Sequence, residues 1–241
     1  MLCAFGDHKR TMTISEVADA CGMNKSSAQR MVYTLEKLGY IEKHPSTRRY
    51  QLTVRALRPG FNYLAGNTLI DIANPYLSEL TNTTQETTCL TEPDSFEMVY
   101  VARFVSSKFV PVHMPIGSRV PMYCTGAGRA YLSALPEQER RKILEAQNLT
   151  QHTMHTNTNA ADLIEMLNEA SRRGYSVNRE ELFLGDMTLG APVIGRNGRP
   201  IAAVHVVAPT SRWTMQEAEQ RLAPALITCA RALSTAVKAM D

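Results

Sequence analysis

The amino-acid sequence predicts an α+β protein with an N-terminal winged helix-turn-helix, a helical connector and a larger C-terminal domain with an antiparallel sheet. Two short helical patterns separated by a glycine predict the first unit. Alternating strand and helix patterns beyond residue 75, with an Asn-Gly turn between two apolar strands, predict the last. The length of 241 residues allows two modest domains or one large one.

Basic residues are concentrated near the N-terminus. Residues 1–60 hold ten Lys/Arg against five Asp/Glu, whereas residues 61–241 hold sixteen against eighteen. A basic N-terminal segment followed by a slightly acidic remainder indicates an anionic partner for the N-terminal segment alone, and nucleic acid is the usual one. A solvated surface with a chance bias is the alternative.

Composition and spacing argue against several other classes of protein. No apolar run approaches the roughly 20 residues of a membrane helix, and MLCAFGDHKR lacks the charge order of a secretory signal. The five cysteines form no CxxC pair, and HTMH (152–155) has no carboxylate or cysteine at ligand spacing. We therefore expect a cytoplasmic protein with no membrane partner, no metal and no cofactor.

The first helical pattern begins at a capping box. Thr13 and Glu16 have the spacing at which each side chain accepts a hydrogen bond from the other's backbone amide. The apolar face that follows is Ile14, Val17, Ala18 and Cys21. Gly22 suits a left-handed turn, and Asn24 can cap a second helix.

The second helical pattern has one apolar stripe and one polar face, and it ends at Gly39. The stripe is Ala28, Met31, Val32, Leu35 and Leu38. The residues expected to contact DNA here are Asn24, Lys25, Ser26, Ser27, Gln29 and Arg30. Donors and short polar groups of this kind reach base edges and phosphates in the major groove.

A β-hairpin is expected next, in the position of a wing. YIEKH and RRYQL flank PST, and Arg48 and Arg49 lie near the tip. Such arginines bind phosphates and position a protein on DNA without reading sequence. The order of these features, from the helix cap through the glycine turn, the apolar stripe and the polar face to the basic wing, predicts DNA binding. The alternative is a helical hairpin and a β-hairpin used for protein contacts.

Segment 56–74 is expected to be a linker helix between a DNA-binding domain, 1–55, and a C-terminal domain, 75–241. Leu57, Phe61 and Leu64 repeat at helical spacing and form a stripe that packs either on a second copy of the chain or on its own domain. Pro59-Gly60 should break or kink the chain, so we place the boundary near residues 53–66.

In the C-terminal region, segments with the 3.6-residue period of a helix alternate with segments that have the two-residue period of a strand. Helix patterns cover 75–84, 128–135, 137–147, 160–173 and 214–238. Strand patterns cover 87–91, 97–105, 109–114, 187–194 and 201–208. The last two strands flank Asn197-Gly198, which is among the strongest hairpin signals.

Five segments together carry a resemblance to a known family. They are ISEVADACGMNKSSAQRMVYTLEKLGYIE, RRYQL, PIGSRVPMYCTGAGRAYLSALP, GYSVNREEL and LGAPVIGRNGRPIAAVHVVAP. The chain resembles transcriptional regulators of the IclR family over essentially its whole length. The resemblance implies a winged helix-turn-helix, a linker helix and a GAF-like effector-binding domain, with the motifs T/S-G-x-G-K/R-A and GY-x-x-D/N-x-EE.

Three features depart from the family pattern. Only MLCAFG stands where relatives have a full first helix, so that helix is expected to be truncated and the core of the DNA-binding domain partly unbuilt. Pro59 lies where relatives have a smoother connector. Asn178 replaces a common aspartate, which is expected to make the pocket neutral and to provide a donor for an anionic ligand.

The segment CTGAGRAYLSALP (124–136) admits more than one interpretation. It lacks the spacing of a phosphate loop and of a nucleophile elbow. Cys124 could pair with His113 or His205 as a nucleophile, although a lone cysteine is more often a small buried hydrophobe. We expect the two glycines to let backbone amides approach a carboxylate at a helix N-terminus, and we expect no catalytic residue.

The resemblance also implies which residues line the effector pocket. They are Phe109, Val120, Tyr123, Thr125, Gly126, Ala127, Asn178, Thr188, His205 and Val207. The apolar members would form a wall that accepts aromatic groups, and His205 could add charge near neutral pH. His205 shares a strand face with Ala203 and Val207, so it needs a partner there. Plain core packing is the alternative for each strand residue.

These observations predict a ligand-responsive DNA-binding regulator of a catabolic operon, not an enzyme. Its expected partners are a palindromic double-stranded operator, a small organic acid, aromatic as a first expectation, and further copies of the chain in a dimer or dimer of dimers. One alternative is a metabolite-binding module or an enzyme acting on a small carboxylate, without a DNA-binding role. An adaptor that uses the winged domain for protein contacts is another.

Overall fold

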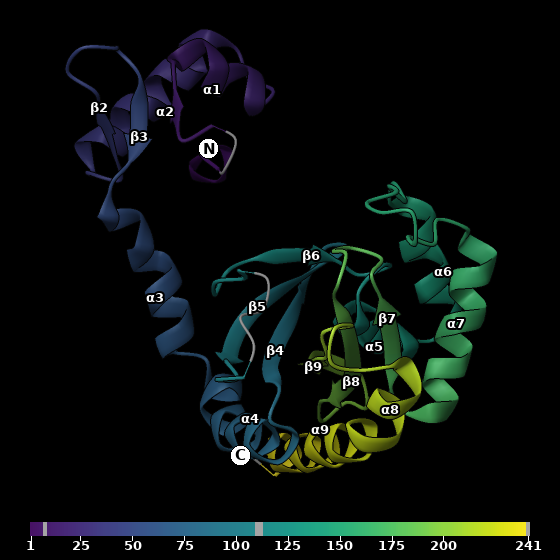
Figure 1. Ribbon diagram of the computed structural model, residues 1–241. Helices are drawn as coiled ribbons and strands as arrows, with labels where there is room; N and C mark the ends of the chain where they lie inside the picture. The colour runs from purple at the N-terminus through teal and green to yellow at the C-terminus, as the bar shows by residue number, and fades with distance from the viewer. Residues whose placement is uncertain (7–8, 109–112, 240–241) are drawn as a thin grey trace. The chain divides into compact units, whose positions relative to one another are not determined.

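The computed structural model describes residues 1–6, 9–108 and 113–239, and the chain divides into two compact units, Met1–Gly66 and Asn67–Asp241 (Figure 1). The first unit contains η1 (Leu2–Ala4), β1 (Thr11–Met12), α1 (Ile14–Ala20), α2 (Lys25–Lys37), β2 (Ile41–Lys43), β3 (Tyr50–Leu52), η2 (Val54–Ala56) and α3 (Leu57–Ala65). The second contains α4 (Thr68–Thr84), β4 (Thr87–Asp94), β5 (Glu97–Phe104), β6 (Arg119–Pro121), α5 (Gly126–Ser133), α6 (Glu137–Ala146), α7 (Ala160–Arg173), β7 (Ser176–Arg179), β8 (Met187–Ile194), β9 (Pro200–Val207), α8 (Met215–Arg221) and α9 (Ala223–Lys238).

The first unit is a winged helix-turn-helix, as predicted. The hydroxyl of Thr13 accepts from the Glu16 amide at 3.3 Å, and the Glu16 carboxylate accepts from the Thr13 amide at 2.7 Å. Gly22 makes the turn with φ +61°, and Asn24 Oδ1 accepts from the Ser27 amide at 2.8 Å. The hairpin β2–β3 is joined by β1 in an antiparallel sheet of order β1-β3-β2.

Residues near the N-terminus contribute to the core of this unit. Phe5 is buried beside Val17, Val32 and Ile41, among other apolar side chains of the two helices and the sheet. Met1, Leu2 and Ala4 pack against the same cluster. The 3-10 turn η1 therefore supplies apolar contacts that the sequence pattern had not predicted.

The predicted break at Pro59-Gly60 is wrong, because α3 runs through both residues. Pro59 is the third residue of the helix, where a backbone N–H has no acceptor within the helix, so no hydrogen bond is lost. The helix ends at Gly66 instead, and Asn67 caps α4 by accepting from the Leu69 amide at 3.0 Å. The expected single linker helix thus contains a helix end and a new cap.

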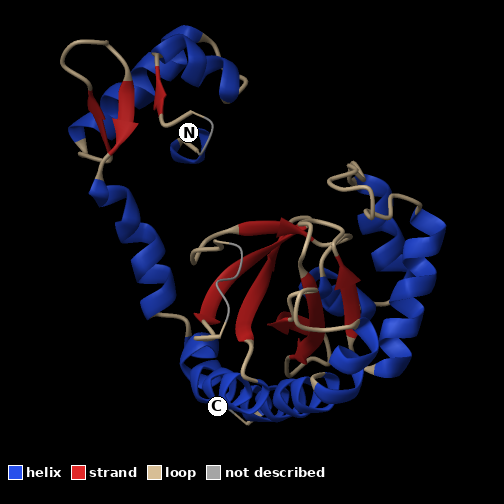
Figure 2. Ribbon diagram, in the orientation of Figure 1, coloured by secondary structure: helices blue, strands red, loops and turns tan. Residues whose placement is uncertain are grey.

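The second unit is built on one antiparallel sheet of six strands in the order β6-β5-β4-β9-β8-β7 (Figure 2). Strands β6 and β7 were not predicted, and the predicted helix 214–238 is divided at Leu222 into α8 and α9. Of the predicted strand 109–114, residues 109–112 lie outside the described residues, and 113–114 are not in a strand.

Different helices pack on the two faces of the sheet. Helix α4, with α9 beside it, packs on one face, where the Thr88 hydroxyl donates to the Leu77 carbonyl at 3.0 Å. Helix α5, backed by α7, packs on the other, which includes Cys89 and Ala203. The close approach of α5 to β8 requires glycine: a Cβ on Gly190 would lie 2.3 Å from the Gly126 carbonyl oxygen.

Candidate DNA-binding surface and effector pocket

The polar face of α2 lies at the surface of the first unit. Lys25, Ser26, Gln29 and Arg30 are exposed, Ser27 is half-buried, and all five lie in the first half of the helix. The side chain of the predicted contact residue Asn24 caps the helix. Because the first turns of a recognition helix are those that reach base edges, this face has the arrangement that major-groove binding needs.

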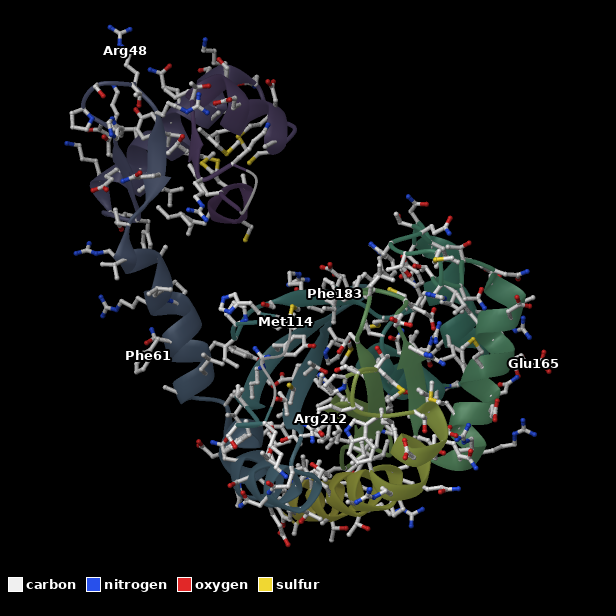
Figure 3. All side chains as sticks on the ribbon, viewed as in Figure 1. Arg48, Phe61, Met114, Glu165, Phe183 and Arg212 are labelled. Carbon is white, nitrogen blue, oxygen red and sulfur yellow. The ribbon has the colours of Figure 1, made fainter. Side chains whose placement is uncertain are left out.

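The structure separates the two wing arginines that the sequence analysis had paired. Arg48, with φ +56°, is exposed and points away from its unit (Figure 3). Arg49 points inward, where its guanidinium donates to Thr11 Oγ1 at 2.9 Å and to Glu16 Oε2 at 2.7 Å. This corrects the expectation for Arg49, whose donors are used to attach β3 to the capping box of α1.

The carboxylate at the centre of this attachment is strongly held in its charged form. The backbone amide of Thr13 and then the guanidinium of Arg49 donate to Glu16 and lower the pKa of its carboxyl to about 2. Arg49 therefore positions the wing relative to the helix-turn-helix, while Arg48 is available to a phosphate.

A two-lobed cavity lies on the α5 side of the sheet in the second unit. Its first lobe is lined by Tyr100, Val120, Thr125, Ala127, Asn178, Leu182, Phe183, Asp186, Thr188 and His205. Its second lobe is lined by Cys89, Tyr100, Arg103, Met114, Phe183, Asp186, Thr188 and Val207. Figure 3 shows Phe183 and Met114, which both line the second lobe.

Most of the predicted pocket residues meet in this cavity, and Tyr123 and Gly126 do not. Tyr123 is buried outside both lobes, where its hydroxyl donates to the Thr150 carbonyl at 2.5 Å. Gly126 packs on Thr188, whose Oγ1 accepts from the Gly126 amide at 3.2 Å. Phe109 lies outside the described residues. Gly126 thus allows α5 to pack closely on β8, whereas the sequence had predicted that it lets backbone amides approach a ligand.

His205 is the most deeply buried polar group of the cavity. It is 1% exposed, its ring meets the Tyr100 ring edge-on with centroids 5.2 Å apart, and no described group hydrogen-bonds to its Nδ1. Burial, and then the positive charge of Arg103, lower the pKa of His205 to about 3. The expectation that it carries charge near neutral pH is wrong, because the imidazole is neutral there.

The pocket is not electrically neutral, although Asn178 is. Asn178 donates through Nδ2 to the Cys124 carbonyl, so the donor expected to meet an anionic ligand binds the backbone. Asp186 lines both lobes, and burial raises the pKa of its carboxyl to about 6, which leaves it ionised at pH 7. Arg103 brings a positive charge to the second lobe and donates to the Met114 carbonyl at 2.7 Å.

Strand parity explains why Tyr100 and Arg103 were missed. Residues three apart in a regular strand face opposite sides of a sheet. Here the pairing passes from Leu90↔Ala102 to Thr91↔Tyr100, which leaves Val101 as an extra residue in β5. This bulge turns Tyr100 and Arg103 to the same cavity. The only feature of the sequence that could have indicated Asp186 is its position immediately before strand β8.

A short loop, 180–186, covers the cavity with Phe183 and Asp186. Its ends are joined, because the Glu180 amide donates to the Asp186 carbonyl at 2.7 Å. At its start Glu181 forms a buried ion pair with Arg129 of α5, with side chains 8% and 2% exposed and Nη1 2.5 Å from Oε1. The T-G-x-G-R-A motif therefore attaches the loop to α5.

The far side of this loop is connected to the end of α4. The Thr210 amide donates to the Gly185 carbonyl at 3.0 Å. Three residues later, Trp213 Nε1 donates to the buried carboxylate of Glu86 at 2.7 Å, and Arg212 pairs with the same group. Glu86 follows Gln85, the residue that ends α4. Residues 210–213 thus connect the pocket loop to the end of α4, through a hydrogen bond at Thr210 and the contacts of Arg212 and Trp213 with Glu86.

Cys124 offers no nucleophile. It is fully buried, it lines neither lobe, and burial raises the pKa of its thiol to about 12. Within the described residues no cluster of side chains is suited to a metal ion, and no helix is both long and apolar enough to cross a membrane.

Comparison with known proteins identifies the family of both units. Residues 1–45 match the IclR helix-turn-helix domain, and residues 61–235 match the family described as bacterial transcriptional regulator IclR C-terminal. The chain belongs to the IclR family. It is a DNA-binding transcriptional regulator, and the family consists of regulators, not enzymes.

Relatives of this IclR-family chain include two regulators from one organism. It is 31% identical over 237 residues to the Pca operon regulatory protein of Acinetobacter baylyi, covering 97% of this chain and 84% of that protein. It is 28% identical over 242 residues to the p-hydroxybenzoate hydroxylase transcriptional activator of the same organism, covering 98% and 89%.

Solved structures agree with the fold. The Thermotoga maritima IclR structure is 27% identical with a TM-score of 0.74, covering 98% of this chain and 95% of that one. An IclR homolog from Microbacterium hydrocarbonoxydans, complexed with 4-hydroxybenzoate, is 21% identical with a TM-score of 0.76, covering 99% and 96%. At that identity the likeness shows the fold alone.

Proposed function

We propose that this regulator controls a catabolic operon in response to a small organic acid, aromatic in the first instance, bound in the two-lobed cavity. Residues 1–55 would bind the operator, 56–74 would link the domains, and 75–241 would bind the effector. The name of one Acinetobacter relative, the p-hydroxybenzoate hydroxylase transcriptional activator, supports an aromatic effector, and that of the other, the Pca operon regulatory protein, supports control of an operon. The observation that carries the effector site is His205, which lines the cavity and whose buried Nδ1 has no hydrogen-bond partner among the described residues.

The charges of the cavity favour an acid over a neutral metabolite. Arg103 supplies a positive charge in the second lobe, and Tyr100, Phe183 and Met114 supply aromatic and thioether surface around it. A carboxylate that leaves water gains most where a guanidinium receives it, because the guanidinium presents several fixed donors. Asp186 restricts where that carboxylate can lie, since the two negative charges repel.

Entry of an acid requires the 180–186 loop to move. Each lobe has a volume of only about 20 Å³, which is room for about one water molecule. Phe183 lines both lobes, and Glu180 and Gly185 at the two ends of the loop have positive φ angles of +56° and +80°. Displacement of Phe183 would enlarge both lobes of the cavity.

A second copy of the chain is proposed to cover the apolar stripe of α3. Leu57 and Phe61 are 69% and 67% exposed, and no described residue of this helix is buried within the chain (Figure 3). Two copies would present two recognition helices to a palindromic operator, whose half-sites lie about 34–36 Å apart. An effector changes operator affinity only as far as it distinguishes two arrangements of those helices.

The test combines operator selection with an acid screen. Duplexes selected from a random pool by the full chain are labelled, and binding is followed by fluorescence anisotropy with and without benzoate, 4-hydroxybenzoate and aliphatic acids. We expect salt-dependent binding of one palindromic sequence whose affinity shifts with one class of acid. Turnover of a bound acid, or duplex binding that no acid alters, would contradict the proposal. Sedimentation of Phe61→Glu tests the paired α3 helices, which that charge should separate.

A further inference from the structure

The linker helix α3 leaves the winged domain without burying any of its described residues. Figure 1 shows it extending away from α1 and from the sheet β1-β3-β2 of the first unit. The helix follows η2 without a break, because Ala56 and Leu57 at the junction both have right-handed helical backbone angles. The direction of α3 relative to the recognition helix α2 is therefore determined where η2 is attached.

Two side chains attach η2 to the C-terminal end of α2. The Thr53 hydroxyl accepts from the Arg55 amide at 3.2 Å, which caps η2, and donates to the Gly39 carbonyl at 2.5 Å. The Arg55 guanidinium donates to the Leu38 carbonyl at 2.6 Å. The last carbonyls of a helix have no donor within the helix and carry a partial negative charge, so a guanidinium is a favoured donor to them.

The absence of a side chain at Gly39 makes room for this contact. Gly39 turns the chain at the end of α2 with φ +75°, and a Cβ there would lie 3.1 Å from Nη1 of Arg55 and 3.3 Å from its Cζ. The guanidinium therefore lies against the backbone that leaves the recognition helix. Arg55 is exposed, so its contact contributes to the geometry of the junction more than to the burial of apolar surface.

From this junction we infer that Arg55 is a positioning residue for operator recognition, which fixes the angle between α2 and α3 and thereby the half-site spacing that the protein accepts. The inference rests on the paired α3 helices of the proposed function. Each base pair added between half-sites moves one of them by about 3.4 Å and rotates it by about 35°. A fixed angle makes such a displaced half-site a poor fit, whereas a loose angle tolerates it.

Operators with altered half-site spacing test this role. The palindromic duplex selected by the full chain is compared, by fluorescence anisotropy, with duplexes in which one central base pair is inserted or removed and with a duplex that carries a single half-site. We expect the unmodified chain to bind the altered spacings about tenfold or more weakly. Arg55→Met, which removes the donors, should reduce that loss to about threefold or less. Its affinity for the single half-site and its salt dependence should be unchanged.

A second arginine of the same linker provides the matched control. Arg58 lies three residues further along, is exposed, and has no hydrogen bond or ion pair among the described residues. Arg58→Met removes the same charge and should discriminate between spacings as sharply as the unmodified chain. Arg55→Lys keeps a charged donor and should restore part of the discrimination that Arg55→Met loses.

The readouts separate positioning from the other roles of an exposed arginine. A fall of about 1 in the slope of log affinity against log salt in Arg55→Met would show a direct phosphate contact and overturn the inference. Equal weakening on all duplexes, the single half-site included, would show a general structural effect and also overturn it. If only the unmodified chain's spacing preference survives in Arg55→Met, the inference alone fails. If the unmodified chain binds all spacings alike, the paired α3 helices of the proposed function fail with it.

Discussion

The DNA-binding surface and the effector pocket place their polar residues in opposite environments. Lys25, Gln29 and Arg30 are exposed on one face of α2, so each can be changed with little effect on folding. Asn178 and His205 are buried in strands β7 and β9 of the sheet, where a polar atom without a hydrogen-bond partner destabilises the fold. Substitutions of the pocket's polar residues should therefore change both stability and ligand binding, whereas substitutions on the exposed face of α2 should change DNA binding alone.

The largest expected effect comes from breaking the ion pair behind the pocket. Arg129→Met should destabilise the second unit by about 3–5 kcal/mol, because it leaves the Glu181 carboxylate buried without its partner. Arg173→Met is the control, since Arg173 pairs with Glu169 and Glu219 at the surface and such pairs contribute about 1 kcal/mol or less. The free energy of unfolding of both variants is measured in denaturant. Equal decreases would contradict the stronger contribution expected of the buried ion pair.

Asp186→Asn should stabilise the free protein at neutral pH. Burial raises the pKa of the Asp186 carboxyl from 3.8 to about 6, so the folded chain holds this proton more tightly than the unfolded chain. The stability from that proton is fully present below pH 3.8 and is lost as pH rises through about 6. At pH 7 the asparagine variant should gain about 3 kcal/mol, and the gain should vanish near pH 4. Thermal unfolding across this range measures it; a gain that is independent of pH would contradict the shifted carboxyl.

Arg30→Ala should weaken binding of the selected operator by about 1–3 kcal/mol, as for a lost base contact, with no change in unfolding temperature. Arg141→Ala, at the exposed Arg141–Glu137 pair on α6, serves as the control. The ratio of specific to non-specific duplex affinity is the quantity to measure. If that ratio is the same in Arg30→Ala and the unmodified chain, Arg30 does not read a base.

The smallest effects should separate the two wing arginines. Arg48→Ala should lower the slope of log affinity against log salt by about 1, because one phosphate contact is lost, and should leave unfolding unchanged. Arg49→Ala should lower the unfolding temperature of the first unit, since the Glu16 carboxylate and the Thr11 hydroxyl lose their donor. The reverse pattern in salt titrations and calorimetry would return the phosphate contact to Arg49.

The helix-turn-helix could be predicted nearly residue by residue because its signals are local. A capping box, a glycine turn and a helical period each depend on residues within a few positions of one another, and the structure confirms them at Thr13, Gly22 and Asn24. Pro59 shows the limit of such reasoning. The residue is a helix breaker by type, but its position in the first turn of α3 decided the outcome.

The pocket could be predicted only in part because its geometry is not local. The resemblance grouped Val120, Thr188 and His205, which line one lobe of the cavity. Composition and strand parity gave no reason to add Tyr100 and Arg103. Their common face follows from the bulge at Val101, which depends on how β5 pairs with β4.

The amino-acid sequence by itself determined the helix-turn-helix, the Asn197-Gly198 hairpin and the position of His205 on one face of its strand. These follow from short-range hydrogen bonding and from the two-residue period of a strand. Only the tertiary structure decided that Arg49 turns inward, that His205 is neutral and that Asp186 shares its cavity. Burial and the charge of distant residues set those properties, and neither is encoded in the order of neighbours along the chain.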